Sequence, residues 1–199
     1  KDFLKKKWNW RAPALISPPG EMNKNWVLFP EKINGKYAIL HSVNPEVKVE
    51  YVDSLDFGDG RYIKSCHGGP PKKDGWDKWV RGAGAPPIKT KDGWLVFYHA
   101  MDDDWSAYKV GAMLLDIADP AKVLCRAKEP VLAPSEEYEK NGFKPGVVYA
   151  TGAVVKDGTL FLYYGSADNH VAVATANLDD FLAALKKDAK PQLSSCVLA

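Results

Sequence analysis

Cysteine is scarce in this sequence. Its three residues, Cys66, Cys125 and Cys196, are odd in number and far apart, and no C-x-x-C spacing occurs. This distribution excludes a dense disulfide framework and a cysteine-based zinc site. We therefore predict reduced thiols, no metal site and a cytoplasmic location.

An excess of charge of either sign is also missing. The 27 lysine and arginine residues nearly balance the 25 aspartate and glutamate residues, which leaves a net charge of +2. Such a balance gives no reason to expect nucleic acid or a membrane surface as a partner. No apolar run approaches the length of a membrane span, so we predict neither kind of partner.

Helix signals are few. The clearest is the segment from Leu178 to Lys186, which Asn177 can cap and which carries Asp179 and Asp180 in its first turn. We predict a short C-terminal helix over about residues 178–187. The rest of the chain points to strands.

Three hairpin-like segments repeat along the chain, at residues 29–41, 87–99 and 153–164. Each has a short apolar strand, then Asn-Gly or Asp-Gly, then a strand rich in aromatic and branched residues. Asn-Gly and Asp-Gly are the strongest short hairpin signals. The glycines, Gly35, Gly93 and Gly158, are 58 and 65 residues apart.

Six residues after these glycines stand His41, His99 and Tyr164, which we expect at equivalent structural positions. Further strands are predicted at residues 47–52, 62–66, 108–116, 123–127 and 170–176. Repeats of three to four strands at this spacing are typical of propeller blades. We predict an all-β fold, a single domain over residues 1–199 that holds about three blades of a propeller. A sandwich of hairpins is the alternative.

Four ordered blocks of the sequence carry a family resemblance. They are residues 24–37 with Leu40-His41, residues 82–90 with Tyr98-His99, residues 108–112 with Leu115-Asp116, and residues 151–154 with residues 163–168. In these blocks the chain resembles glycoside hydrolase family 130, the β-mannoside phosphorylases and β-1,2-mannosidases. The resemblance implies a five-bladed β-propeller with a central pocket. It also implies inverting cleavage of a β-mannoside oligosaccharide, with inorganic phosphate as co-substrate and no cofactor.

The resemblance suggests six candidate binding residues. Lys24, His41, Arg81, His99 and Tyr108 are candidates for a phosphate-binding cluster, and Asp168 is a candidate for binding sugar hydroxyls. Each has a structural alternative: Lys24 as a surface lysine, the two histidines as packing residues, Arg81 stacked on Trp76 and Trp79, Tyr108 in the core, and Asp168 as a turn cap.

Two departures from the family bear on mechanism. The family's general acid lies in an Asp-Pro-Arg type motif, and the only Asp-Pro here is Asp119-Pro120, so no catalytic residue is assigned. Where phosphorylases tend to have arginine after the Leu-His block, this chain has Ser42, which leaves hydrolysis open. We expect the general acid in N-terminal blades that this chain lacks. The three or so blades predicted here would form an open arc, which we expect to pair with such blades or to self-associate. An inactive sugar-binding remnant or one half of a split propeller is the alternative.

Overall fold

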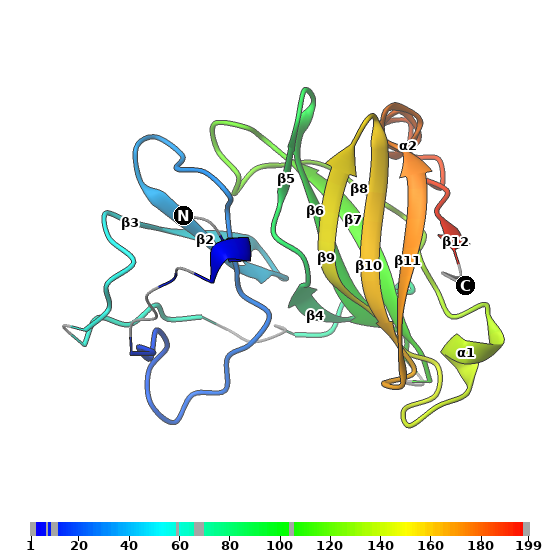
Figure 1. Ribbon diagram of the computed structural model, residues 1–199, viewed down its shortest axis with the longest axis horizontal. Coiled ribbons are helices and arrows are strands. Elements are labelled where there is room, and N and C mark those ends of the chain that lie inside the picture. Colours follow the sequence, from blue (N-terminus) through cyan, green and yellow to red (C-terminus); the bar gives the residue numbers. More distant parts are fainter. Residues whose placement is uncertain are drawn as a thin grey trace.

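The computed structural model describes residues 3–6, 8, 12–58, 60–65, 70–103 and 106–196. Over these residues the chain forms three antiparallel β-sheets, which lie side by side along the long axis of the molecule (Figure 1). Helical elements are minor: η1 (Phe3–Lys5), α1 (Glu137–Lys140) and α2 (Leu178–Lys186). The prediction of an all-β fold is confirmed.

Sheet 1 is the N-terminal sheet. It consists of β1 (Val27–Leu28), β2 (Tyr37–Val43) and β3 (Val47–Val52), in that order. The predicted turn at Asn34-Gly35 is present, with φ of 50° and 80°. Both residues have positive φ, as a type I′ turn requires, and glycine meets that requirement without steric cost.

Sheet 2 is the central sheet. Its strands are β4 (Trp79–Ala83), β5 (Ile88–Thr90), β6 (Gly93–Met101), β7 (Tyr108–Leu115) and β8 (Val123–Arg126), and both β4 and β5 pair with one edge of β6. Every residue of β6 is buried. The predicted turn is displaced by one residue: Thr90 pairs with Gly93, so Lys91 and Asp92 form the loop and Gly93 begins the strand.

Sheet 3 is the C-terminal sheet, with strands β9 (Val148–Lys156), β10 (Thr159–Ser166), β11 (His170–Asn177) and β12 (Ser194–Cys196). The turn at Asp157-Gly158 has φ of 49° and 75°, as in sheet 1. Helix α2 follows directly, where the Asn177 side chain accepts a hydrogen bond from the Asp180 amide. The prediction of the C-terminal helix is confirmed.

The core consists of two apolar layers between the sheets. One layer joins sheets 1 and 2 through residues such as Leu40, Trp94 and Val96. The other joins sheets 2 and 3 through residues such as Phe97 and Leu162. Face-to-face stacking of sheets explains why β6, in the middle, is buried on both sides.

One predicted strand is wrong. Residues 62–65 form no strand, and Cys66 lies outside the described residues. The segment instead packs Ile63 against Ile39 and Phe57 on the outer side of sheet 1. The Ile63 amide donates to the Ile16 carbonyl at 2.9 Å, and residues 62–65 cover sheet 1 as a loop and not as a fourth strand.

Candidate substrate and anion site

Two of the sequence-predicted residues form a direct pair. Arg81 lies on β4 and Tyr108 begins β7, and the Arg81 Nε donates a hydrogen bond to the Tyr108 hydroxyl at 3.1 Å. Both side chains are half-buried. The pairing follows from the sheet register, because β4 and β7 flank the last part of β6 on its two sides.

His99 lies next to this pair and is fully buried. Its ring stacks on the Tyr149 ring with 3.8 Å between centroids, and its Nε2 lies 3.0 Å from the Ala150 carbonyl oxygen. A carbonyl only accepts, so Nε2 carries the proton. Burial lowers the pKa of His99 from 6.5 to about 4, and the imidazole is therefore neutral near pH 7.

Asn25 and Tyr149 complete the cluster, and the sequence did not single them out. The Asn25 amide donates to the Arg81 carbonyl at 2.6 Å and accepts from the Tyr149 hydroxyl at 2.7 Å. The Tyr149 ring in turn lies 5.9 Å from the Tyr108 ring. Asn25 stood inside one of the motif blocks, beside Lys24, and that was the available signal. Tyr149 had no comparable signal, because it precedes its block by two residues.

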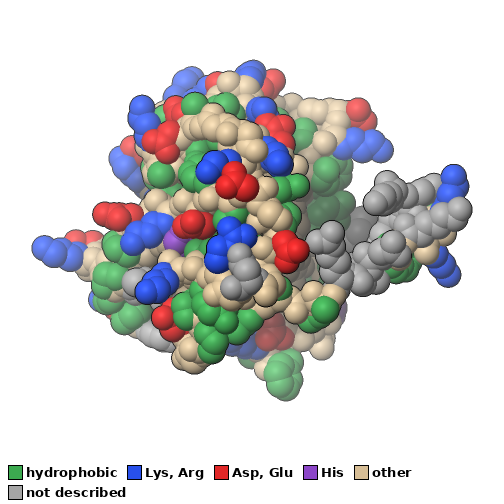
Figure 2. All heavy atoms as spheres, turned by 90° about the vertical axis from the view of Figure 1, so that its left-hand side faces the viewer, with side chains coloured by type: hydrophobic (Ala, Val, Ile, Leu, Met, Phe, Trp, Pro, Cys, Tyr) green, Lys and Arg blue, Asp and Glu red, His purple; other side chains and the backbone are tan. Residues whose placement is uncertain are grey.

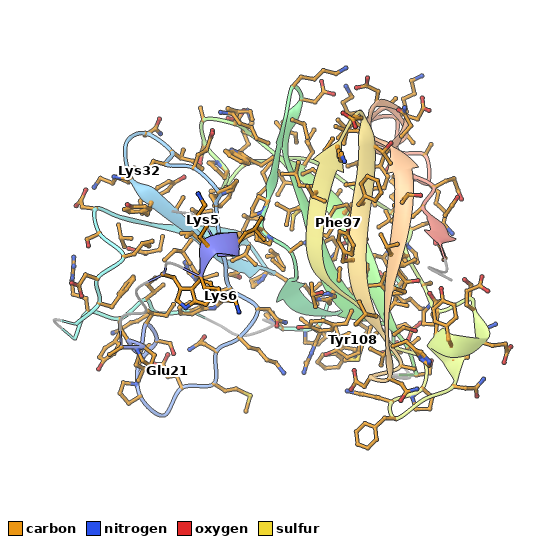
Figure 3. All side chains as sticks on the ribbon, viewed as in Figure 1. Lys5, Lys6, Glu21, Lys32, Phe97 and Tyr108 are labelled. Atoms are coloured by element: carbon orange, nitrogen blue, oxygen red, sulfur yellow. The ribbon has the colours of Figure 1, made fainter. Side chains whose placement is uncertain are left out.

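A cavity of about 170 Å³ opens against the Arg81–Tyr108 pair. It lies at the end of sheet 2 where Figure 3 labels Tyr108. Its walls comprise two cationic side chains, a phenol, a serine and three apolar residues, namely Arg81, Met101, Ser106, Tyr108, Lys144, Pro145 and Val147. Among the residues that the structure describes, no carboxylate lines the cavity, and these side chains therefore favour an anion over a cation.

Lys24 and Asp168 are exposed. Lys24 directly precedes Asn25. Asp168 stands in the β10–β11 turn with φ of 51°, and its neighbour Ala167 donates to the carbonyl of Val147, a cavity residue, at 2.9 Å. The structure thus places both residues beside the cluster, but gives neither a side-chain contact with it among the described residues.

His41 is not brought together with the cluster. Its Nδ1 lies 2.8 Å from the Ser65 hydroxyl, and its ring packs edge-on against Trp26 at 5.7 Å. Trp26 belongs, with Ile39, to the cluster on the outer side of sheet 1. Burial, and to a lesser degree Lys48, lowers the pKa of His41.

The expectation that His41 and His99 are structurally equivalent is wrong. Because the second hairpin turn is shifted by one residue, the residue in register with His41 is Tyr98. A shift of one residue moves a side chain to the opposite face of its sheet. Tyr98 packs toward sheet 1, whereas His99 faces Tyr149 and Ala150 of sheet 3.

Two acidic residues that follow β6 are paired with lysines. Asp102 pairs with Lys109, Asp103 pairs with Lys78 at 2.5 Å, and Asp104 lies outside the described residues. Asp119 follows β7 at the end remote from Tyr108, and an eight-residue strand spans about 25 Å. Asp119-Pro120 is therefore not a general acid for this cavity.

The surface agrees with the near-neutral charge. On the face shown in Figure 2, Lys and Arg side chains are interspersed with Asp and Glu side chains. Among the described residues, no helix is long and apolar enough to cross a membrane, and no group of three or more His, Cys, Asp and Glu side chains gathers to hold a metal ion.

Comparisons with known proteins agree with the blocks seen in the sequence. A family model described as beta-1,4-mannooligosaccharide phosphorylase matches residues 19–187. A 1,2-beta-oligomannan phosphorylase of Thermoanaerobacter sp. is 45% identical over 174 residues, which is 87% of this chain and 55% of that protein. A beta-1,2-mannobiose phosphorylase of Listeria innocua is 40% identical over 177 residues, 84% of this chain and 48% of that protein.

The solved structure of a beta-1,2-mannobiose phosphorylase from Listeria innocua, in complex with beta-1,2-mannobiose, superposes with a TM-score of 0.72 at 37% identity. The match covers 85% of this chain and 48% of that one. The chain therefore spans about half the length of the curated relatives that it matches.

Proposed function

The chain belongs to glycoside hydrolase family 130, and on that premise we propose that it forms part of a phosphorylase acting on β-mannosides, with inorganic phosphate as the attacking group and no cofactor. The observation that carries this proposal is the cavity beside the Arg81–Tyr108 pair, which two cationic side chains line and, among the described residues, no carboxylate. The similarity to a 1,2-beta-oligomannan phosphorylase and to the beta-1,4-mannooligosaccharide phosphorylase family model supports the substrate class.

The proposed reaction replaces one bond at the anomeric carbon by another. A phosphate oxygen attacks that carbon from the face opposite the leaving group, the glycosidic carbon–oxygen bond breaks, and a general acid gives a proton to the leaving oxygen. The products are a mannosyl phosphate of inverted configuration and a shortened saccharide. Arg81 and Tyr108 hold the phosphate, since guanidinium and phenol donors match its oxygens.

The remaining candidates take supporting roles in this proposal. Neutral His99, held by Tyr149 and Ala150, fixes the wall of the pocket between sheets 2 and 3. Lys24 and Asp168 are exposed beside the cluster, and we propose them as contacts for sugar hydroxyls. His41, bonded to Ser65 and packed against Trp26, we assign to packing of sheet 1.

The general acid is proposed to come from further blades of a five-bladed propeller. Sheet 3 supports this, because its outer face carries partly exposed apolar side chains: Val154 at 47%, Tyr163 at 41% and Val171 at 86%. Monomeric proteins rarely leave such side chains contiguous and uncovered. Preceding blades, or failing those a second copy of the chain, would cover this face. A cytoplasmic location remains part of the proposal.

Hydrolysis is the second candidate, and Ser42 favours it. The Ser42 hydroxyl donates to the carbonyls of Asn44 and Glu46 at 3.1 and 3.0 Å, so this position offers no cation to a phosphate. In a hydrolase, water would replace phosphate as the attacking group.

The test is phosphate binding and turnover by the purified chain. We expect saturable binding of inorganic phosphate that Arg81→Gln weakens by about tenfold, with Arg61→Gln as the control at an exposed arginine of sheet 1's loop. Phosphate binding that is absent, or unchanged by Arg81→Gln, would contradict the proposal.

Turnover of β-1,2-mannobiose by this chain alone should stay near background, because a general acid contributes about 10² to 10⁴ in rate. A turnover near ~10 per second would show that the acid is within this chain. Free mannose formed at a rate independent of phosphate would favour the hydrolase instead.

A further inference from the structure

Lys144 is the second cation of the cavity, and nothing in its sequence context singled it out. It lies in the loop between α1 and β9. The Lys144 amide donates to the Ala167 carbonyl at 2.9 Å, and two residues on, the Gly146 carbonyl accepts from the Tyr108 amide at 2.9 Å. These bonds fix the backbone of an exposed residue between the β10–β11 turn and the start of β7.

The loop is also packed tightly against that turn. A Cβ at Gly142 would meet the Ala167 Cβ and carbonyl oxygen at 2.7 Å. The amide of Gly146 donates to the Glu139 carbonyl of α1 at 3.0 Å. The backbone position of Lys144 beside the cavity is thus set by its neighbours.

The Lys144 ammonium points to the same ring that Arg81 binds. Its Nζ lies 5.4 Å from the centroid of the Tyr108 ring, and the hydroxyl of that ring accepts from Arg81 Nε. Two cations therefore converge on one phenol. Like charges brought together repel each other, so this arrangement is favourable when an anion lies between them.

Three other lysines in this part of the chain pair with carboxylates. Lys78 and Lys109 pair with Asp103 and Asp102, and Lys72 pairs with Asp77. Within the described part of the chain, no carboxylate pairs with Lys144. Its charge is available to a ligand in the cavity.

The size of the cavity suits a phosphoryl group. Its volume of about 170 Å³ equals that of roughly five to six water molecules at about 30 Å³ each. A tetrahedral oxyanion and a few waters fit this space.

We propose that Lys144 binds the phosphoryl group opposite Arg81 and so sets the affinity of the site for that group, whether it is inorganic phosphate or the phosphate of a sugar ester. This inference rests on the proposed function for its ligand class. With Lys144 included, the anion is held between Arg81 on β4 and Lys144 in the α1–β9 loop. The Lys144 amide bonds to the carbonyl of Ala167, which directly precedes Asp168, the proposed sugar contact.

The test is a titration of the purified chain at constant ionic strength with inorganic phosphate and, separately, with mannose 1-phosphate, followed by calorimetry or phosphorus NMR. We expect Lys144→Gln to weaken phosphate binding by about tenfold and Lys144→Arg to restore most of it, because the charge and not the chain packing is responsible. Lys140→Gln, in α1, is the matched control at an exposed lysine outside the cavity and should leave binding unchanged.

Three results separate the possibilities. If Lys144→Gln leaves the affinity for both ligands unchanged while Arg81→Gln weakens it, the Lys144 proposal is overturned and the proposed function stands. If the unmodified chain binds neither ligand, both fall. If only mannose 1-phosphate binding depends on Lys144, the residue binds the sugar ester, and its role toward free phosphate is overturned.

Discussion

His41 and His99 follow their hairpin glycines by the same six residues, and yet they serve different parts of the molecule. His99 lies between sheets 2 and 3, stacked on Tyr149 and within the cluster whose members Arg81 and Tyr108 line the anion cavity. His41 lies on the outer side of sheet 1 with Trp26 and Ser65. The contrast shows that a repeat in sequence does not ensure a repeat in function when the turn register changes.

The cluster and the cavity beside it are instead formed by residues from all three sheets. On the side of sheet 1, Asn25 precedes β1 and makes hydrogen bonds with both Arg81 and Tyr149. Sheet 2 provides Arg81, His99 and Tyr108. The α1–β9 loop and β9 provide Lys144 and Tyr149. A site of this kind depends on the stacking of the sheets, and substitutions at the stacking contacts should act on the two histidines very unequally.

The largest change in the free energy of unfolding is expected for Gly84→Ala, which disturbs the packing around His99 and leaves that around His41 intact. A Cβ at residue 84 would meet the Ala150 oxygen at 2.2 Å and His99 Cε1 at 2.4 Å. Both neighbours are buried and cannot yield easily, so we expect a loss of about 3 kcal/mol in the free energy of unfolding. Urea denaturation measures it.

Gly152→Ala on β9 is the control, because its Cβ would have nothing closer than 3.9 Å. It should change the free energy of unfolding by less than about 0.5 kcal/mol. If Gly84→Ala were equally mild, the tight contact between β4's end and His99 would not exist as described.

The second effect is a difference in pH dependence. The pKa of folded His99 is about 4, below its unfolded value of 6.5, so the unfolded state takes up the proton first as the pH falls. Its neutral form therefore stabilises the fold above pH 6.5, and this stability is lost between pH 6.5 and 4. Relative to His99→Gln, the unmodified chain should lose about 2 kcal/mol between pH 7 and pH 5.

His41→Gln provides the comparison. The pKa of His41 is also lowered, so the sign is the same, but its ring borders the surface and the effect should be smaller. Denaturation at the two pH values checks both. A larger effect at His41 than at His99 would reverse the assignment of the buried histidine.

The sequence predicted the elements better than their register. Asn34-Gly35 and Asp157-Gly158 marked two turns correctly because both residues adopt positive φ there. In the middle hairpin the same dipeptide signal was misleading, since Thr90 pairs with Gly93 and the loop is Lys91-Asp92. Only the backbone pairing distinguishes a turn at Asp92-Gly93 from one at Lys91-Asp92, and the residue types do not predict that pairing.

For the site, the motif blocks identified binding residues on strands of sheet 2. They did not identify residues that other parts of the fold bring next to those strands. Arg81, Tyr108 and His99 were predicted and lie together. Lys144 and Tyr149 were missed, because Lys144 reaches the cavity from the α1–β9 loop and Tyr149 reaches His99 through the packing of β9 on sheet 2. Residues in such connections follow no periodic pattern.

The smallest effect sharpens the comparison most. Tyr149→Phe removes the hydroxyl that donates to Asn25 at 2.7 Å but keeps the ring that stacks on His99. Ser65→Ala removes the hydroxyl that bonds His41 Nδ1 at 2.8 Å and the His41 carbonyl at 2.9 Å. Each should cost about 1 kcal/mol in the free energy of unfolding, the usual net contribution of such hydrogen bonds.

Phosphate affinity should separate the two variants even though their stabilities agree. Tyr149→Phe loosens Asn25, which binds the Arg81 carbonyl, so phosphate binding should weaken by about two- to fivefold. Ser65→Ala acts on the outer side of sheet 1 and should leave phosphate binding unchanged. Calorimetric titration of both variants measures this. Equal weakening by Ser65→Ala would mean that His41 does belong to the anion site, and the division between the two histidines would have to be abandoned.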